Sequence, residues 1–162
     1  MPISALPVPL RRVGYRVAHA MLRLYWRIAR PQTRGVKCVV RDGDAAVFVR
    51  HAYGDRRRET WIVAGGGEVV AHLEDPRDTA AREAREELGL ELEDWRALGS
   101  VESHGYGKRT TVICFEAHSS HRALTLDAGE IEEAGWFALV DPPAPLGLDA
   151  RVVLTRLVLG PG

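Results

Sequence analysis

Three glutamates that are spaced to share one side of a helix lie near the middle of this chain of 162 residues. Glu83, Glu86 and Glu87 stand at i, i+3 and i+4, so on a helix their carboxylates would emerge one turn apart. Like charges at this spacing destabilise a helix, whereas clustered hard oxygen ligands suit Mg²⁺ or Mn²⁺. We interpret the three glutamates as candidate ligands of a divalent cation, with a solvated acidic face as the alternative.

The residues around these glutamates carry the signals of a helix with defined ends. Pro76, Asp78 and Thr79 favour a start, and Gly89 favours a stop. Four residues between them recur at helical spacing and give a narrow apolar stripe: Ala80, Ala81, Ala84 and Leu88. Upstream, the apolar run 61–64 ends in three glycines, whose tolerance of positive φ lets the backbone approach a ligand or a metal.

From Glu74 to Leu90 the chain resembles the signature of the Nudix hydrolase family. That signature reads G-x5-E-x7-R-E-U-x-E-E-x-G-U, where U is a bulky apolar residue, and this chain reads E-DPRDTAA-R-E-A-R-E-E-L-G-L. Ala84 is smaller than the usual residue at its position. The segments 46–51 and 130–137 also look like Nudix segments, so the likeness spans residues 35 to 140.

The glycine end of the signature differs in this chain. Glu68 stands where the spacing requires glycine. With Gly66 in the role of the signature glycine, the loop that leads to Glu74 has two additional residues. We expect the segment 65–73 to be a mobile loop that closes over substrate, because ordering each additional residue costs conformational entropy.

The resemblance implies a fold, a reaction and a cofactor. The fold would be an α/β (α+β) one, a Nudix-like α/β/α sandwich with a mixed β-sheet. The chain would be a pyrophosphohydrolase acting on acid anhydrides, which hydrolyses a phosphoanhydride bond in a nucleoside diphosphate linked to another moiety. Mg²⁺ or Mn²⁺ would polarise the phosphoryl oxygens and lower the pKa of bound water. The implied catalytic residues are Glu74, Arg82, Glu83, Glu86, Glu87 and Glu130, and the implied metal ligands are Glu83, Glu86, Glu87 and a carbonyl at Gly66.

Within this set the resemblance implies different roles. Arg82 and Glu74 would form a pair that orients the metal-binding face of the helix. The general base is open between Glu83, Glu87, Glu130 and Glu133, and a surface carboxylate is the alternative interpretation of Glu130.

Three arginines that flank the predicted site are candidate substrate-binding residues: Arg50, Arg58 and Arg109. The substrate would be a small nucleotide-type molecule; ADP-ribose, a nucleotide sugar, a dinucleoside polyphosphate and an oxidised nucleoside triphosphate all stay open. A domain that binds nucleotides or a partner without hydrolysis is the alternative function, motivated by the altered glycine loop.

The first 34 residues form a basic segment ahead of a hydrolase domain at 35–162. Residues 1 to 37 hold eight basic residues and no acidic one, and residues 14 to 30 are predicted to form a helix that ends before Pro31. One apolar stripe runs along it: Val13, Val17, Met21, Leu24 and Ile28. We favour packing of this amphipathic helix on the domain or in a homodimer interface; peripheral contact with an anionic membrane is the alternative.

Composition bounds the remaining possibilities. A content of 46% apolar and 27% charged residues is that of an ordinary globular domain, and a net charge of zero gives no general attraction for nucleic acid. Cys38 and Cys114 lie among apolar neighbours and are predicted to be buried free thiols, which fits a cytoplasmic location.

Strands are predicted at 36–41, 45–50, 61–63, 95–102, 109–117 and 136–139, and a closing helix at 151–159.

Overall fold

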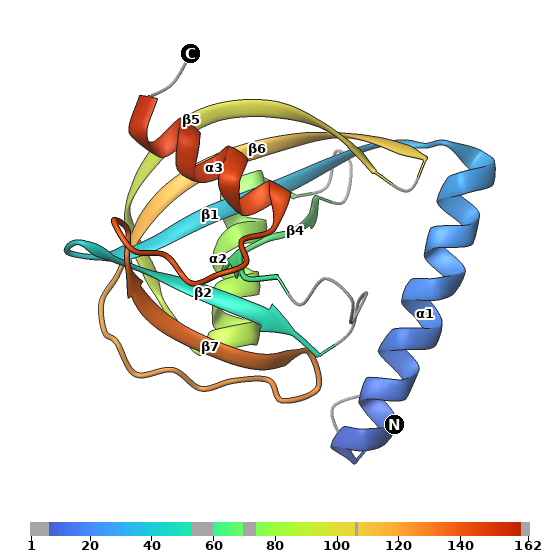
Figure 1. Ribbon diagram of the computed structural model, residues 1–162, viewed down its shortest axis with the longest axis horizontal. Helices are drawn as coiled ribbons and strands as arrows, with labels where there is room; N and C mark the ends of the chain where they lie inside the picture. The colour runs from blue at the N-terminus through green and yellow to red at the C-terminus, as the bar shows by residue number, and fades with distance from the viewer. Residues whose placement is uncertain (1–6, 53–59, 70–73, 106, 160–162) are drawn as a thin grey trace.

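A computed structural model describes residues 7–52, 60–69, 74–105 and 107–159 of the chain. Within these described residues, three helices and seven strands follow one another (Figure 1). They are α1 (Val8–Ala29), β1 (Gln32–Asp42), β2 (Ala45–His51), β3 (Ile62–Val63), β4 (Gly67–Val69), α2 (Pro76–Leu88), β5 (Leu92–Gly105), β6 (Lys108–Ser119), β7 (Ile131–Ala138) and α3 (Leu148–Leu159).

The strands form one mixed sheet in the order β3-β2-β1-β6-β5, with β4 added to β1 and β7 added to β2. β1 and β6 run parallel, and the other neighbouring pairs are antiparallel. The predicted β1–β2 hairpin is present: Asp42 pairs with Ala45, and Gly43 takes the positive φ of 59° that its turn requires.

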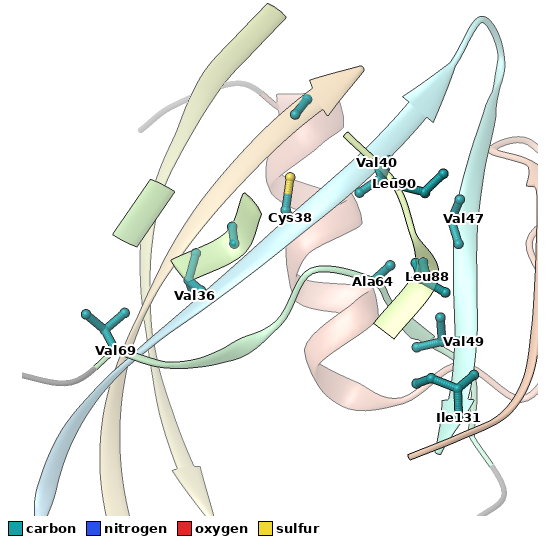
Figure 2. Close-up of a cluster of buried hydrophobic side chains, with 12 residues drawn as sticks. Val36, Cys38, Val40, Val47, Val49, Ala64, Val69, Leu88, Leu90 and Ile131 are labelled. Atoms are coloured by element: carbon teal, nitrogen blue, oxygen red, sulfur yellow. The ribbon is translucent and has the colours of Figure 1, made fainter. Parts of the chain in front are cut away.

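The central strands carry apolar side chains on both faces, and each face is covered by a helix. Along β1, Cys38 and Val40 belong to the core on the α2 side, whereas Val39 belongs to the core on the α3 side. Figure 2 shows the first of these cores. Successive side chains of a strand point to opposite faces, so a strand that is apolar at every position must be covered twice. The predicted α/β/α sandwich with a mixed sheet is therefore confirmed.

The local sequence signals predicted the limits of α2 well, but the predicted ranges of other elements were too short. Asp75 caps α2 by accepting a hydrogen bond from the Arg77 amide over 2.8 Å, and Gly89 ends it with a φ of 69°. β7 begins at Ile131, five residues before the predicted strand, and α3 begins three residues early. Cys38 and Cys114 are buried free thiols, as expected.

The glycine-rich segment is more ordered than the sequence predicted. Gly67–Val69 forms β4, which pairs with β1, and Val69 is a core residue with only 3% of its surface exposed. The prediction of a mobile loop was therefore wrong for this part, because backbone pairing and burial of a valine order it. Residues 70–73 lie outside the described residues. The predicted boundary after residue 34 falls inside β1, where Arg34 pairs with Val69 and Thr111.

The N-terminal helix begins at Val8, six residues before the predicted start, and ends where Arg30 adopts a left-handed conformation. It is anchored on the domain through polar contacts at both ends rather than through its apolar stripe. Near its start, Arg11 forms an ion pair of 3.0 Å with Asp127. Near its end, Lys108 Nζ lies 3.8 Å from the centre of the Trp26 ring. None of the helices that the structure describes is long and apolar enough to cross a membrane.

Candidate active site

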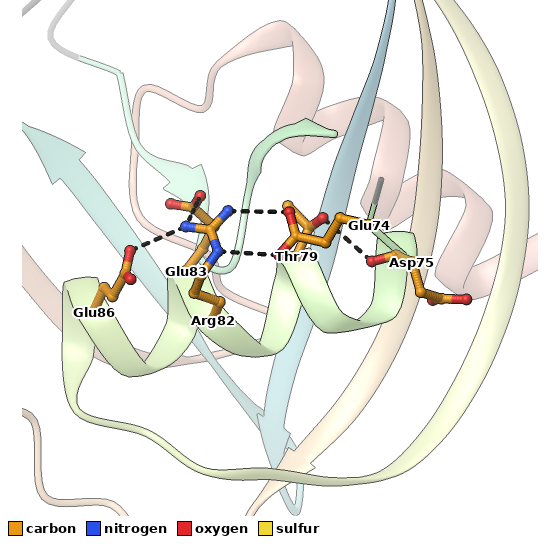
Figure 3. A network of polar contacts seen from close by, with 6 residues as sticks. All are labelled: Glu74, Asp75, Thr79, Arg82, Glu83 and Glu86. Atoms are coloured by element: carbon orange, nitrogen blue, oxygen red, sulfur yellow. Dashed lines mark hydrogen bonds and ion pairs between the residues drawn. The ribbon is translucent and has the colours of Figure 1, made fainter. Parts of the chain in front are cut away.

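Arg82 is the centre of a polar network on α2 (Figure 3). Its Nε donates a hydrogen bond to Glu74 Oε1 over 3.2 Å, which is the pair expected from the sequence. Its Nη1 lies 3.0 Å from Glu83 Oε1 and donates to Glu86 Oε2 over 3.1 Å. The hydrogen bond from Arg82 lowers the pKa of Glu74. One guanidinium thus holds three carboxylates in defined positions.

The helix glutamates line a cavity together with two carboxylates from another part of the chain. The acidic cavity has a volume of about 490 Å³ and is lined by Arg82, Glu83, Glu86, Glu87, Asp127 and Glu130. Asp127 and Glu130 lie in the turn that precedes β7, where the amides of Glu130 and Ile131 both donate to the Asp127 carbonyl. Among the residues that the structure describes, the tertiary fold therefore brings five carboxylates and a single guanidinium around one space.

Burial and mutual repulsion make this arrangement unfavourable for negative charge. Glu87 is 5% exposed, and burial, followed by the charge of Glu83, raises its pKa to about 8, while Lys37 acts in the opposite direction. Burial also raises the pKa of Glu83, against the effect of Arg82. Desolvation of this kind is typical of sites that bind cations or transfer protons.

The glycines before α2 differ in what they contact. Gly65 has a φ of 63°, which favours glycine. A Cβ at Gly66 would lie 2.6 Å from Lys37 Nζ, and a Cβ at Gly67 would lie 2.7 Å from Glu83 Oε1. Gly66, which the sequence suggested as a metal ligand, is thus beside a cation, and Gly67 is the glycine in contact with a candidate ligand.

The donor set fits a hard divalent cation, but the side chains as they stand are paired with arginine. Among the described residues, no three carboxylate, imidazole or thiol groups converge closely enough to hold a metal ion. The reason is visible in the network: Glu83 and Glu86 are both turned toward Arg82. Carboxylate oxygens are the ligands that Mg²⁺ and Mn²⁺ prefer. Both side chains line the cavity, so a metal ion there would compete with Arg82 for their oxygens.

The structure does not bring the predicted substrate-binding arginines to the acidic cavity. Arg50 forms an ion pair of 2.6 Å with Glu133 across the β2–β7 ladder and stacks over Trp61. Arg109 is the second residue of β6 and lines a different hollow, beside α1. Arg58 lies outside the described residues. Binding of substrate by Arg50, Arg58 and Arg109 stays a prediction.

Three residues of the site were not found from the sequence. Asp127 follows an unremarkable polar stretch, and Lys37 lies inside β1, so neither position carries a motif. Tyr15 of α1 donates a hydrogen bond to Glu130, and this bond, with burial, raises the pKa of Tyr15 to about 12. Only the packing of α1 across the 127–130 turn reveals that contact.

Comparison with known proteins adds independent findings. A family model described as the NUDIX domain matches residues 31–157 of the chain. A search of the curated proteins finds no match.

Several solved structures have a similar fold. The MutT NUDIX hydrolase from Burkholderia pseudomallei is 25% identical, with a TM-score of 0.69 over 78% of this chain and 98% of that chain. The MutT protein from Methanosarcina mazei Go1 is 22% identical, with a TM-score of 0.66 over 82% of this chain and 96% of that chain. The NUDIX domain of Shewanella oneidensis NrtR, in complex with ADP ribose, is 18% identical, with a TM-score of 0.65 over 80% of this chain and 88% of that chain.

Proposed function

The chain belongs to the Nudix family, and from this premise we propose that it hydrolyses a phosphoanhydride bond in a nucleoside diphosphate linked to another moiety. The observation that carries the proposal is the acidic cavity, in which five carboxylates surround about 490 Å³. A cavity this acidic repels a polyphosphate unless a cation is present, so a divalent metal is part of the proposal.

We assign metal binding to Glu83, Glu86 and Glu87, with a backbone carbonyl at Gly66 or its neighbour Gly67 as a further ligand. When bound, a divalent cation neutralises phosphoryl oxygens and acidifies bound water. The raised pKa of Glu87, about 8, supports a site whose carboxylates gain from a positive charge. Neither Mg²⁺ nor Mn²⁺ is preferred by the donor set.

The remaining residues of the site would orient the carboxylates and accept a proton from the attacking water. Arg82 holds Glu74 and the ligand-bearing side of α2 in register, which fixes the direction of the carboxylates. Glu130 faces the same cavity from the 127–130 turn and is held there by the Tyr15 hydroxyl, so it is placed to accept a proton from an attacking water. Glu83 and Glu87 are the competing candidates for that proton.

Nucleotide binding without hydrolysis is the second candidate function, and one observation favours it. As described, Arg82 occupies the contacts of Glu83 and Glu86 that a metal would need. The NUDIX domain of Shewanella oneidensis NrtR is described in complex with ADP ribose, which is a precedent for nucleotide binding by a domain of this fold.

A substrate panel separates the two functions. ADP-ribose, a nucleotide sugar, a dinucleoside polyphosphate and an oxidised nucleoside triphosphate would each be incubated with Mg²⁺, with Mn²⁺ and with excess EDTA. We expect phosphate products with at least one substrate, and none in EDTA. Calorimetric binding of a panel member with no product under any metal would support the binding function instead. The variant Glu91→Gln should keep the activity, because Glu91 is exposed and pairs with Arg85 outside the cavity.

A further inference from the structure

The apolar stripe of α1 points away from the domain. Its residues are exposed by 54% to 77%: Leu10, Val13, Val17, Met21, Leu24 and Ile28. Tyr15, His19 and Trp26 occupy the opposite side of the helix and are half-buried. α1 stands along one edge of the molecule (Figure 1), so a continuous apolar face on a helix of about 33 Å is available for docking.

Polar contacts hold the helix in this orientation. At its start, Arg12 donates to the Ala128 carbonyl over 3.0 Å, beside the ion pair of Arg11. At its end, the backbone approaches the β5–β6 turn so closely that a Cβ at Gly107 would lie 2.9 Å from the Trp26 carbonyl oxygen. Because both ends are fixed by the polar side, the apolar side cannot turn inward without breaking these contacts.

A strongly basic groove runs beside the apolar face. This groove, between α1 and the β5–β6 hairpin, has a volume of about 1070 Å³, and its charged or titratable lining residues are Arg23, Arg27, Arg30, His104, Lys108 and Arg109. No acidic residue lines it among the described parts of the chain. Arg27, Arg30 and Arg109 form no ion pair with any residue that the structure describes. Leu24 belongs to both the groove and the apolar face, so the two surfaces are continuous.

We propose that α1 docks this protein on an anionic lipid bilayer, with the apolar stripe in the interface and lipid phosphates in the basic groove. An apolar face beside arginines is the composition of a helix that lies in the plane of such a surface. The charge distribution supports the orientation: residues 1–37 hold eight basic residues and no acidic one, so residues 38–162 hold 14 basic and 22 acidic residues. A negative surface therefore attracts the side of the protein that carries the basic helix.

Charge also argues against a second copy of the chain as the occupant. Packing α1 against α1 of another molecule would bury the two stripes, but it would bring arginines of both helices together. The helix has no acidic residue with which to pair them. Lipid phosphates supply the charge that a second α1 lacks.

Vesicle sedimentation of the full chain tests the proposal. We expect binding to vesicles of equal parts phosphatidylglycerol and phosphatidylcholine at low salt, weaker binding at high salt, and little binding to phosphatidylcholine alone. Met21→Glu with Ile28→Glu should reduce the partition coefficient about tenfold or more, because two apolar contacts are lost. Arg27→Glu with Arg30→Glu should weaken binding and flatten its salt dependence.

Matched controls make the result specific. Val140→Glu and Leu148→Glu also add charge at exposed apolar positions, but outside α1, and should bind vesicles as the unaltered protein does. All variants should keep their melting temperature and their turnover of a soluble substrate, because the altered side chains are exposed and outside the acidic cavity.

Three outcomes would overturn the proposal. The first is absence of binding to anionic vesicles at low salt. The second is binding that Met21→Glu with Ile28→Glu leaves unchanged, because the apolar stripe would then not lie in the interface. The third is a dimer in sedimentation equilibrium that the same double variant dissociates, because a second copy would then cover the stripe.

Discussion

Nε of Arg82 and Oε1 of Glu74 lie 3.2 Å apart, and Nη1 of the same guanidinium contacts Glu83 and Glu86. The arginine thus links Glu74, which lies ahead of the N-cap of α2, to two candidate metal ligands on the helix. Because its side chain is 38% exposed and that of Glu74 is 25% exposed, the pair is worth little to stability. The Arg82–Glu74 pair matters instead because it fixes the positions of the carboxylates.

We expect Arg82→Ala to lower turnover strongly while the melting temperature changes by only a few degrees. Glu83 and Glu86 would lose the group that fixes their direction, so the affinity for Mn²⁺ should change as well. The measurements are kcat, calorimetric binding of Mn²⁺ and thermal unfolding. Glu74→Gln should show the same pattern, and the double variant should be little worse than either single one. Additive losses would contradict a shared positioning role.

Glu87→Gln should abolish turnover but stabilise the metal-free protein at high pH. The pKa of Glu87 is raised from 4.5 to about 8 in the fold, so the stability gained from its protonated form is complete below about pH 4.5 and lost as the pH rises through 8. The variant should therefore melt several degrees above the unaltered protein at pH 9, with no such difference at pH 4. Thermal unfolding in EDTA across this range measures it, with Glu91→Gln as the control.

Tyr15→Phe should lower kcat several-fold with little change in KM. The variant removes the hydroxyl that donates to Glu130, which would leave that carboxylate less well oriented to accept a proton. Tyr25→Phe is the matched control, since Tyr25 lies on the same helix and is 56% exposed. Steady-state kinetics on the best substrate of the panel give the result. An unchanged kcat in Tyr15→Phe would contradict a role of Tyr15 in positioning Glu130.

His51 should make the protein sensitive to acid. Burial lowers its pKa from 6.5 to about 4, so the unfolded chain binds a proton that the folded chain does not between these values. Stability is fully present above pH 6.5 and falls, by on the order of 3 kcal/mol, as the pH drops toward 4. His51→Gln should flatten the dependence of melting temperature on pH in this window. His121→Gln, at an exposed position, should not change the slope.

Val69→Ala should destabilise the protein by about 1–3 kcal/mol, because it removes buried methyl groups from the core on the α2 side. Denaturant unfolding measures the change. Val140→Ala is the control, since Val140 is 96% exposed and should cost nothing measurable. A neutral Val69→Ala would contradict a contribution of Val69 to the core.

Local chemistry in the sequence was enough to determine α2 and its functional face. A proline and an acidic residue at one end and a glycine at the other fix the limits of the helix, and the spacing of Glu83 and Glu87 fixes their common side. The two apolar segments 36–41 and 45–50, with glycine between them, likewise determined the β1–β2 hairpin. These features depend on residues that are close together in the sequence, so they can be predicted without the tertiary structure.

The other half of the site depended on contacts between distant parts of the chain. Asp127 and Glu130 join the acidic cavity, about forty residues after the helix glutamates, only because β7 returns beside β2. The direction of α1 was decided in the same way: its amphipathic pattern predicted a helix, but not which face would meet the domain. Ion pairing with Asp127 and the contacts of Trp26 turned the polar face inward and left Met21 and Ile28 in solvent. A helical period specifies that two faces exist, and only the partners that surround the helix determine which one is buried.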